Sequence, residues 1–584
     1  MFVDDLVKGF YDVVSKNKVL ILVNYDVDAI CAAKIFQYIL RFDNVVYVLV
    51  PVKTTTELKK TYEEQKAGVK HIVLINCGGS LDIIDILEPE EDIIFFITDS
   101  HKPTDICNVY SSSQIRLLAT PEEDEKIPEF DEIFRDEESS EDDSNSDEPN
   151  DDSNNDNIEK RQNRRRMRQQ NAFIKRKERR NWEEKRKKLL FDYTQFSYYG
   201  RSSAILMYDL AWKLHRESVD VLWWGIIGVT EQFIFGKTEN MRYLKEIELI
   251  GDHIGRICES TIIHNNLNSA SQPVPSNDTT NLRIESEKDL LLALYRHWTI
   301  ESSIRFSMFT AVSLKLWTVK GEKRLKQILA EMGLPLSESR QMYHSMDLNL
   351  RKQFFGMMEK MSNTHNLLNL TYPSFILYQG FKTRYQSADY VYSMIATLES
   401  NIHGNSSTEC FYNTMDLLSR RNYYRSKKNL LDEGIERAKW VLTNMFRHIQ
   451  AALDMKQVIL AGPFYYLIVQ EGTLNSQHYS NPQLLVMLAS FALRAQVASS
   501  NKNKNVRLPL IASAVLDSAK ETCIVVGIPP ITESLPRSFF GKAFEQVANK
   551  TSIDISLDYF DSSIATIQIK DRPTFFDALT ALLS

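Results

Sequence analysis

The first hundred residues alternate between two apolar patterns. Continuous apolar runs rich in β-branched residues are typical of buried strands, and they occur at 19–23, 45–50, 71–75 and 93–98. Amphipathic stretches typical of helices lie between them, at 29–40, 55–65 and 81–87. Strands that alternate with helices in this way predict a mostly parallel sheet with right-handed crossover connections. The expected fold class is therefore α/β.

Polar residues directly follow the predicted strands. Asp26 and Asp28 come after the first strand, and Asp99 and His101 come after the fourth. Because the carboxyl ends of parallel strands meet at one edge of a sheet, where such folds bind ligands, we expect these side chains to converge. Two aspartates one residue apart can share a hard cation through their oxygens. Asp28 can instead cap the following helix, and on this stretch alone the cap is the favoured interpretation.

Further along the chain, the pattern loses its strands and then recovers them. Helical periodicity dominates between residues 235 and 400, which predicts an all-helical insert. Its predicted helices are 241–257, 287–296, 302–317, 321–332, 338–342, 348–361 and 388–399. After residue 401 the pattern is α/β again. A long helical stretch is predicted over 419–455, with strands at 458–460, 465–471, 508–515, 522–527 and 565–569.

Charge is distributed unevenly, although the net charge of the 584 residues is only −7. Residues 122–156 contain 18 acidic and 2 basic side chains, and residues 159–188 contain 15 basic and 4 acidic ones. The stretch 137–157 has almost no apolar residues, so we expect it to be a disordered insertion, and we expect the segment 122–157 to be dispensable for folding. The basic segment lacks glycine and proline, which favours a long helix. Its favoured role is nuclear targeting, with a nucleic-acid arm or a solvated surface helix as alternatives.

These changes of pattern divide the chain into four predicted parts. An α/β domain comprises residues 1–118 and 189–234, and the acidic and basic segments form an insertion at 119–188. A helical domain spans 235–400, and a second α/β domain spans 401–584.

Several classes of protein are excluded by what the sequence lacks. The six cysteines include no CxxC pair, which argues against a zinc or iron–sulfur site and for reduced intracellular thiols. The longest apolar run, 458–469, is too short to span a bilayer. No phosphate-binding P-loop signature occurs, so ATP hydrolysis by this chain is not expected. We therefore expect a soluble intracellular protein that needs no cofactor or metal.

The residues after the predicted strands resemble the motifs of the DHH phosphoesterases, a superfamily that includes the RecJ exonucleases. Asp-x-Asp follows the first strand, Asp-x-His follows the fourth, and the stretch GVTE resembles a later motif. In that family these positions bind two divalent metals, usually manganese, and activate water for phosphodiester hydrolysis. The resemblance places Asp26, Asp28, Asp99, His101 and Glu231 at metal-site positions.

Three positions depart from this pattern. Asn24 stands where the active pattern has an acid or a histidine, Asn76 replaces a bridging aspartate, and Ser100 replaces the first histidine of the DHH triplet. The two asparagines remove negative charge that would offset two cations. We therefore expect the remaining acids to serve structure, with amides, hydroxyls and the histidine as their hydrogen-bond partners.

A closer resemblance covers nearly the full length of the chain. The segments YDVDA, LINCG, TDSHKP, GRSSAILMYDLAW, WWGIIGVTEQ and FFGKAFE occur in the order found in the cell division control protein 45 family. These eukaryotic replication factors descend from a RecJ-like ancestor. The resemblance implies a RecJ-like DHH domain, a helical insert and a C-terminal domain like the DHHA1 substrate-binding domain of the exonucleases.

The same resemblance implies partners and a compartment. A protein of this family would work in the nucleus, where it joins the minichromosome maintenance hexamer and the GINS tetramer as the replicative helicase. Replicative polymerases and loading factors are further expected partners, and no membrane partner is expected. Three functions follow: a non-catalytic scaffold in that helicase, which is favoured, a compatible binder of single-stranded DNA, and the alternative of an active manganese-dependent single-strand DNA exonuclease.

Other residues are candidates for a cap or for contacts. Ser202 or Ser203 is expected to cap a helix that ends at residue 214. The C-terminal domain lacks the Gly-Gly-His motif of the exonucleases, and the nearest stretch offers Arg537 and Lys542 as candidate DNA contacts. The helical insert is rich in aromatic residues, which pack in cores but are also favoured at interfaces. Candidate partner contacts there are Trp298, Phe306, Phe309, Trp317, Phe354 and Phe355.

Overall fold

The computed structural model describes all residues except 120, 122–124, 135–155, 269–281, 366, 368, 380–382, 401–405, 420–428, 473–474, 501–506 and 533–535. The described residues form two compact units. The main unit comprises Met1–Thr120 and Ser197–Ser584, and the inserted unit comprises Pro121–Phe196. Within the described part, no helix combines the length and the apolar character needed to cross a membrane.

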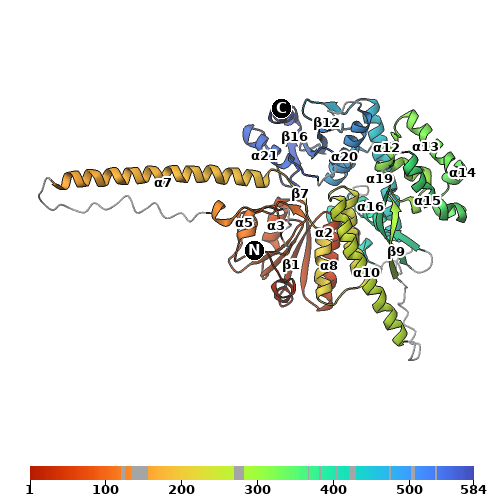
Figure 1. Ribbon diagram of the computed structural model, residues 1–584, viewed down its shortest axis with the longest axis horizontal. Coiled ribbons are helices and arrows are strands. Elements are labelled where there is room, and N and C mark those ends of the chain that lie inside the picture. The colour runs from red at the N-terminus through yellow and green to blue at the C-terminus, as the bar shows by residue number, and fades with distance from the viewer. Residues whose placement is uncertain are drawn as a thin grey trace. The chain divides into compact units, whose positions relative to one another are not determined.

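The main unit begins with a five-stranded parallel sheet in the order β2-β1-β3-β4-β6 (Figure 1). Its strands are β1 (Val19–Asn24), β2 (Tyr47–Val52), β3 (His71–Ile75), β4 (Ile94–Thr98) and β6 (Ile115–Leu117). The helices of this part are α1 (Asp12–Val14), α2 (Val27–Phe42), α3 (Thr55–Gln65), α4 (Ile83–Leu87), α5 (Ile106–Tyr110), α8 (Ser203–Lys213) and α9 (Val219–Ile234). The predicted α/β class and the first four strands are confirmed.

Burial explains why β1 has a continuous apolar sequence. Its residues Val19–Val23 are fully buried, as expected for a central strand covered on both faces. Helix α2 packs against β1 and β3 on one side and against α8 and α9 on the other, so its small residues, including Ala29, Ala32 and Ala33, are fully buried. The strand ends at Asn24 and the helix begins at Val27, which places polar residues at a tight junction.

The part after α9 mixes helices with strands. Its elements are α10 (Asn240–Asn268), β8 (Leu282–Leu290), α11 (Ile300–Phe306), α12 (Met308–Leu314), α13 (Val319–Glu331), α14 (Leu336–Ser339), α15 (Leu348–Thr364), β9 (Thr371–Gln379), β10 (Thr383–Gln386) and α16 (Ser387–Leu398). The prediction of an all-helical insert is wrong, because β8, β9 and β10 form an antiparallel sheet. The helix predicted at 287–296 is also wrong, because residues 287–290 belong to β8 and only a short 3-10 turn follows at Tyr295–His297. The sequence of β8, LRIESEKDL, has only three apolar residues and lacks the alternation that would predict a strand.

The last part of the main unit contains a six-stranded sheet in the order β11-β12-β13-β14-β16-β15. Its elements are α17 (Ser407–Leu417), α19 (Leu430–Asp454), β11 (Ile459–Leu460), β12 (Tyr465–Ile468), α20 (Pro482–Ser499), β13 (Leu510–Asp517), β14 (Thr522–Ile528), α21 (Phe540–Lys550), β15 (Ile555–Ser556), β16 (Ile564–Gln568) and α22 (Arg572–Leu583). Helix α20 packs on β13 and β14. A separate apolar cluster joins the sheet to Phe540, Phe544 and Phe575 of α21 and α22.

The inserted unit contains the basic segment as one helix, α7 (Asp156–Thr194), and the short α6 (Phe130–Ile133). The predicted long helix is confirmed. The stretch predicted to be disordered, 137–157, lies outside the described residues apart from its last two residues, which begin α7. The described residues 125–134 of the acidic segment make contacts within the inserted unit, where Ile133 is buried and Glu132 bonds Lys185 at 2.8 Å. Tyr193 likewise donates to Glu125 at 3.2 Å. Most of the acidic segment lies outside the described residues.

Candidate functional site

The carboxyl ends of β1 and β3 bring Asp26, Asp28 and Asn76 together. Asn76 Nδ2 lies 3.3 Å from both carboxylate oxygens of Asp26 and 3.2 Å from Asp28 Oδ2. Asn24 Nδ2 donates to Asp26 Oδ2 at 3.0 Å, and the backbone N–H of Ala29 donates to Asp26 Oδ1 at 2.6 Å. Asp26 is therefore the N-cap of α2, and the favoured interpretation of Asp28 as that cap is wrong.

Asp28 caps a different helix. Its carboxylate accepts the backbone N–H groups of Ser203 at 2.9 Å and Ala204 at 3.0 Å, which are the free donors at the start of α8, and it also accepts the Ser202 hydroxyl. Ser202 occupies the N-cap position of α8, as predicted, but its side chain makes no capping bond to the helix, and Asp28 bonds the free N–H groups instead. Gly228 of α9 permits this approach, because a Cβ there would lie 2.7 Å from Asp28 Oδ1.

Asp99 and His101 form an ion pair at the end of β4. Their side chains meet at 2.7 Å through His101 Nδ1, and the backbone N–H of His101 donates to the same oxygen at 2.9 Å. The other oxygen of Asp99 accepts the N–H groups of Gly78 and Gly79 at 3.1 and 2.7 Å. A Cβ at Gly79 would lie 2.6 Å from Asp99 Cβ, so the glycine is needed for this contact.

The second partner set of Asn76 fixes the orientation of its amide. Asn76 Oδ1 accepts the Ser203 hydroxyl at 2.6 Å and the backbone N–H of Ser100 at 3.1 Å. The amide nitrogen must therefore face Asp26 and Asp28. Because an amide N–H₂ donates hydrogen bonds and offers no lone pair to a cation, Asn76 cannot bridge two metal ions from this position.

A lysine that the sequence did not single out completes the cluster. Lys237 Nζ donates to Glu231 Oε1 at 2.7 Å and lies 4.7 Å from the ring centroid of Tyr199. Gly236 ends α9 with φ +66°, and the N–H of Lys237 bonds the carbonyl of Gln232 at 2.8 Å. This Schellman turn directs the chain back over Glu231. The sequence analysis predicted no helix over 219–234, so it gave no reason to place a turn at Gly236 or Lys237 beside Glu231.

Electrostatics within this cluster follow from its burial. Burial, together with the charge of Asp28, raises the pKa of Asp26 to about 7. Burial also raises the pKa of Glu231, although Lys237 opposes that shift. For the ion pair, burial alone would act against both charges, but the mutual attraction prevails. It lowers the pKa of Asp99 and raises the pKa of His101 to about 9.

We name these residues the strand-tip cluster: Asp26, Asp28, Asn76, Asp99, His101, Glu231 and Lys237. The aspartates have the donors that the sequence analysis expected, namely amides, hydroxyls and the histidine. The donor set does not fit the two metal ions implied by the DHH motifs, because amide nitrogens and an ammonium occupy positions facing the carboxylates. The arrangement holds the carboxylates in place through hydrogen bonds and ion pairs.

A cavity of about 140 Å³ adjoins the cluster. Its polar wall includes Asp26, His101, Tyr199, Glu231, Lys237 and Asp561. Its apolar wall comes from the central and C-terminal parts of the chain and includes Phe306, Met308, Leu442, Met445, Met487 and Phe491. Tyr199 donates to Asp561 at 3.0 Å across this region, and Gln483 donates to the backbone carbonyl of Tyr25 at 2.6 Å. These bonds hold α20 and the loop before β16 over the strand tips.

The two candidate DNA contacts lie outside this cavity and have partners within the protein. Lys542 bonds Glu545 at 2.8 Å on α21. Arg537 is exposed, and its guanidinium lies 5.5 Å from the ring centroid of Tyr198. The structure therefore does not bring them to the strand-tip cluster.

The six aromatic candidates of the insert are not exposed. Trp317 and Phe354 are core residues, with 7% and 1% of their surface accessible, so their assignment as partner contacts is corrected. The other four are half-buried, and Trp298 stacks on Phe306 with ring centroids 5.3 Å apart. The exposed apolar residues of the nearby helices were missed. They are Val319, Leu336 and Leu348, the first residues of α13, α14 and α15.

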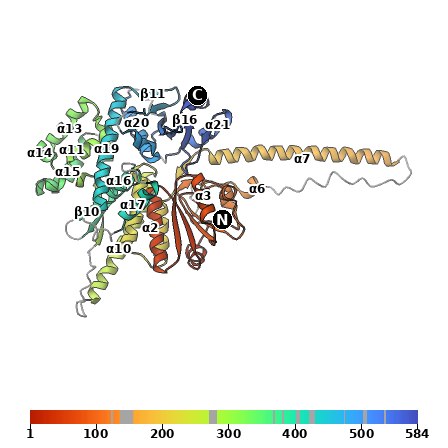
Figure 2. The same ribbon diagram turned by 180° about the vertical axis from the view of Figure 1, so that it is seen from behind.

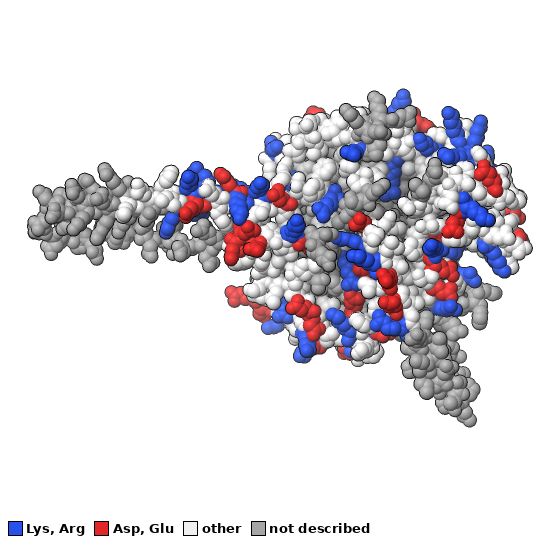
Figure 3. All heavy atoms as spheres, in the orientation of Figure 1, with Lys and Arg blue, Asp and Glu red and all other residues white. Residues whose placement is uncertain are grey.

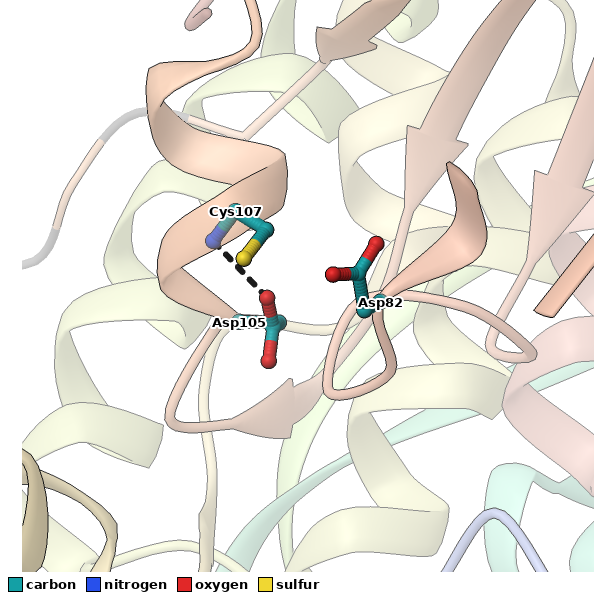
Figure 4. A group of neighbouring side chains, drawn as sticks. All are labelled: Asp82, Asp105 and Cys107. Atoms are coloured by element: carbon teal, nitrogen blue, oxygen red, sulfur yellow. Dashed lines mark hydrogen bonds between the residues drawn. The ribbon is translucent and has the colours of Figure 1, made fainter. Parts of the chain in front are cut away.

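A second group of polar residues, Asp82, Asp105 and Cys107, lies near the start of α4 and α5 (Figure 4). Asp82 accepts the N–H of Asp85 at 3.2 Å, and Asp105 accepts the N–H of Cys107 at 2.8 Å. Both aspartates are therefore helix N-caps. Burial and both carboxylates raise the pKa of the Cys107 thiol to about 12, so it is a poor ligand at neutral pH.

Comparison with known proteins identifies the family of the chain. The CDC45 family model matches residues 19–582. The cell division control protein 45 homolog of Mus musculus is 39% identical over 585 residues, covering all of both chains. The crystal structure of CDC45 from Entamoeba histolytica superposes with a TM-score of 0.68 at 21% identity over the full length of both chains. A manganese-bound exonuclease RecJ structure is more distant, with a TM-score of 0.40 at 9% identity, covering 97% of this chain and 90% of that chain. This chain therefore belongs to the cell division control protein 45 family, a family of DNA replication factors.

Proposed function

We propose that this chain is a non-catalytic scaffold subunit of the eukaryotic replicative DNA helicase, required for initiation and elongation of DNA replication. The observation that carries the proposal is the orientation of Asn76, whose amide nitrogen faces Asp26 and Asp28 where a hydrolase of this fold would need a bridging carboxylate. The expected partners are the minichromosome maintenance hexamer and the GINS tetramer, with replicative polymerases and loading factors as further partners. The expected compartment is the nucleus.

The surface supports a role in binding other proteins. Helices α13, α14 and α15 lie together in both views, separated from the five-stranded sheet by α16 and α19 (Figures 1 and 2). Each begins with an exposed apolar residue: Val319, Leu336 and Leu348 are 73%, 43% and 50% exposed. We propose this group of helices as the docking surface for the hexamer, in place of the aromatic residues chosen from the sequence.

We also propose that the chain binds single-stranded DNA. On the face drawn in Figure 3, basic side chains lie beside acidic ones over the described surface, and no continuous basic track is visible among the described residues of that face. Such a track is the usual basis of sequence-independent binding. Arg537 and Lys542 remain candidate contacts for DNA.

The alternative function, a manganese-dependent single-strand DNA exonuclease, is distinguished by a digestion experiment. The purified full chain is incubated with end-labelled single-stranded oligonucleotides and either manganese or magnesium. We expect no metal-dependent loss of substrate beyond that seen with a matched Asp26→Ala, Asp99→Ala double variant. Metal-dependent digestion that disappears in the double variant would show an active nuclease and overturn the scaffold proposal.

The scaffold proposal also has a direct test. The full chain is used as bait in nuclear extract, and the co-purifying subunits are identified. We expect subunits of the hexamer and of the GINS tetramer in the same fraction. Recovery of neither, with a folded bait, would contradict the proposal.

A further inference from the structure

The cavity beside the strand-tip cluster has two walls of different chemistry. One wall carries carboxylates, and the other carries methionine and aromatic side chains from α12, α19 and α20, including Met308, Met445, Met487 and Phe491. Methionine adapts its shape to different apolar groups. A cavity of about 140 Å³ is close in size to one that holds a single benzene-sized molecule, roughly 150 Å³. The occupant should therefore be small and have one polar and one apolar end.

The polar wall carries an excess of negative charge. The carboxylates at or directly behind it are Asp26, Asp28, Asp99, Glu231 and Asp561. Against them stand His101 and Lys237, together with Arg494, whose Nη2 would lie 3.4 Å from a Cβ at Gly236, so carboxylates still outnumber cations. Lys53 and Glu399, which also line the cavity, oppose each other and leave this balance unchanged. An excess of negative charge in a buried site favours a cationic occupant.

One oxygen of this wall has no partner. Glu231 is 3% exposed, and its Oε1 accepts a bond from Lys237, whereas its Oε2 is buried without a donor among the described residues. An unsatisfied buried carboxylate oxygen is unfavourable because it has lost its hydrogen bonds to water. The oxygens of Asp26 and Asp28 nearby are already bonded to N–H donors of the protein, so they are not free to ligate a metal ion that needs several oxygens. An ammonium group needs fewer acceptors than such a metal.

We propose that this cavity binds a small organic cation, a primary ammonium attached to an apolar or aromatic body, with the ammonium on Glu231 and the body between α12, α19 and α20. This site is additional to the scaffold function and does not depend on it. Glu231 Oε2 has almost no accessible surface in the structure, so the Glu231 side chain must turn toward the ammonium, which then donates to this oxygen while Lys237 holds Oε1. Aromatic rings such as Phe491 and the neighbouring methionines bury the apolar body.

The test uses three small probes and the full chain. 2-Phenylethylamine has both features, 2-phenylethanol has the apolar body without the charge, and ethylamine has the charge without the body. Each is titrated by isothermal calorimetry at pH 7. We expect 2-phenylethylamine to bind at least ten times more tightly than either other probe. Equal binding of the alcohol overturns the proposal. The proposal is also overturned if the amine does not bind at concentrations up to about 10 mM, a Kd that corresponds to a binding free energy of about −3 kcal/mol.

Two variants locate the binding. Met487→Trp should fill the apolar wall and abolish binding of 2-phenylethylamine, while Met241→Trp on the exposed face of α10, 62% exposed, should leave it unchanged. Glu231→Gln should weaken the amine at least tenfold and leave the alcohol unaffected. Undiminished amine binding in Met487→Trp overturns the proposal even if Glu231→Gln fails to fold. Thymidine 5′-monophosphate is a fourth titrant, and tight binding of this anion in place of the amine would also overturn it.

Discussion

The strand-tip cluster and the α13–α15 helices differ in where they direct their side chains. In the cluster, Asp28 is 2% exposed and Asn76 is 1% exposed, and both bond other parts of the fold. At the start of α13, by contrast, Val319 is 73% exposed. The residues able to do chemistry are thus engaged inside the protein, while apolar side chains remain at the surface.

This comparison predicts that an acidic residue at position 76 causes the largest loss of stability. Asn76→Asp would place a third carboxylate beside Asp26 and Asp28 and remove the amide that donates to both. We expect a loss of about 4 kcal/mol in the free energy of unfolding at pH 7, because an uncompensated charge would be buried. Chemical denaturation checks this. The matched control is Asn349→Asp at an exposed position, which should change stability by less than about 0.5 kcal/mol.

Removing the internal cation is the next largest change. Lys237→Met leaves Glu231 and Asp26 without their nearest ammonium, and we expect a loss of about 3 kcal/mol. Adding Glu231→Gln removes the stranded charge and should restore part of that loss. A double-mutant cycle on the unfolding free energy measures the coupling. Additive effects of the two substitutions would show that Lys237 is not the counter-ion of Glu231.

The Asp99–His101 pair predicts a dependence on pH of smaller size. The pKa of His101 is raised to about 9 in the folded protein, above its ordinary 6.5. The contribution of protonated His101 to the unfolding free energy is therefore fully present below pH 6.5 and is lost as the pH rises through 9. We expect His101→Gln to flatten the decline in unfolding free energy between pH 7 and 9.5 by on the order of 2 kcal/mol. A decline of the same steepness in this variant would contradict the assigned pair.

The sequence predicted which strand ends carry the residues of the cluster, but it did not predict the hydrogen bonds between them. The apolar runs of β1 and β3 located Asp26 and Asn76 at one sheet edge, because period and strand ends are local properties. Asp28 contacts Ser202 at the start of α8, and these two residues are 174 positions apart in the sequence. No local sequence pattern predicts such a contact. The position of Lys237 depends on the turn at Gly236.

The insert shows the opposite limitation. Its helices were largely predictable from periodicity, yet composition could not tell a core aromatic from a surface one. Phe354 is buried among Tyr295 and Tyr343, with ring centroids 5.9 and 6.2 Å away, while the aliphatic residues that begin α13, α14 and α15 are exposed. Exposure depends on tertiary packing, which sequence alone does not supply.

The exposed residues of α13–α15 yield the prediction with the smallest effect on stability. A Val319→Ser, Leu336→Ser, Leu348→Ser triple variant should fold with an unfolding free energy within about 0.5 kcal/mol of the parent for each site, because these side chains are mostly exposed. Its affinity for the minichromosome maintenance hexamer should fall at least about tenfold if this surface contains anchor residues. Co-purification and titration with the hexamer measure that loss. Phe354→Ala is the contrasting core variant, and it should cost about 3 kcal/mol or more in stability. Normal assembly by the folded triple variant would show that the hexamer docks on another surface of the chain.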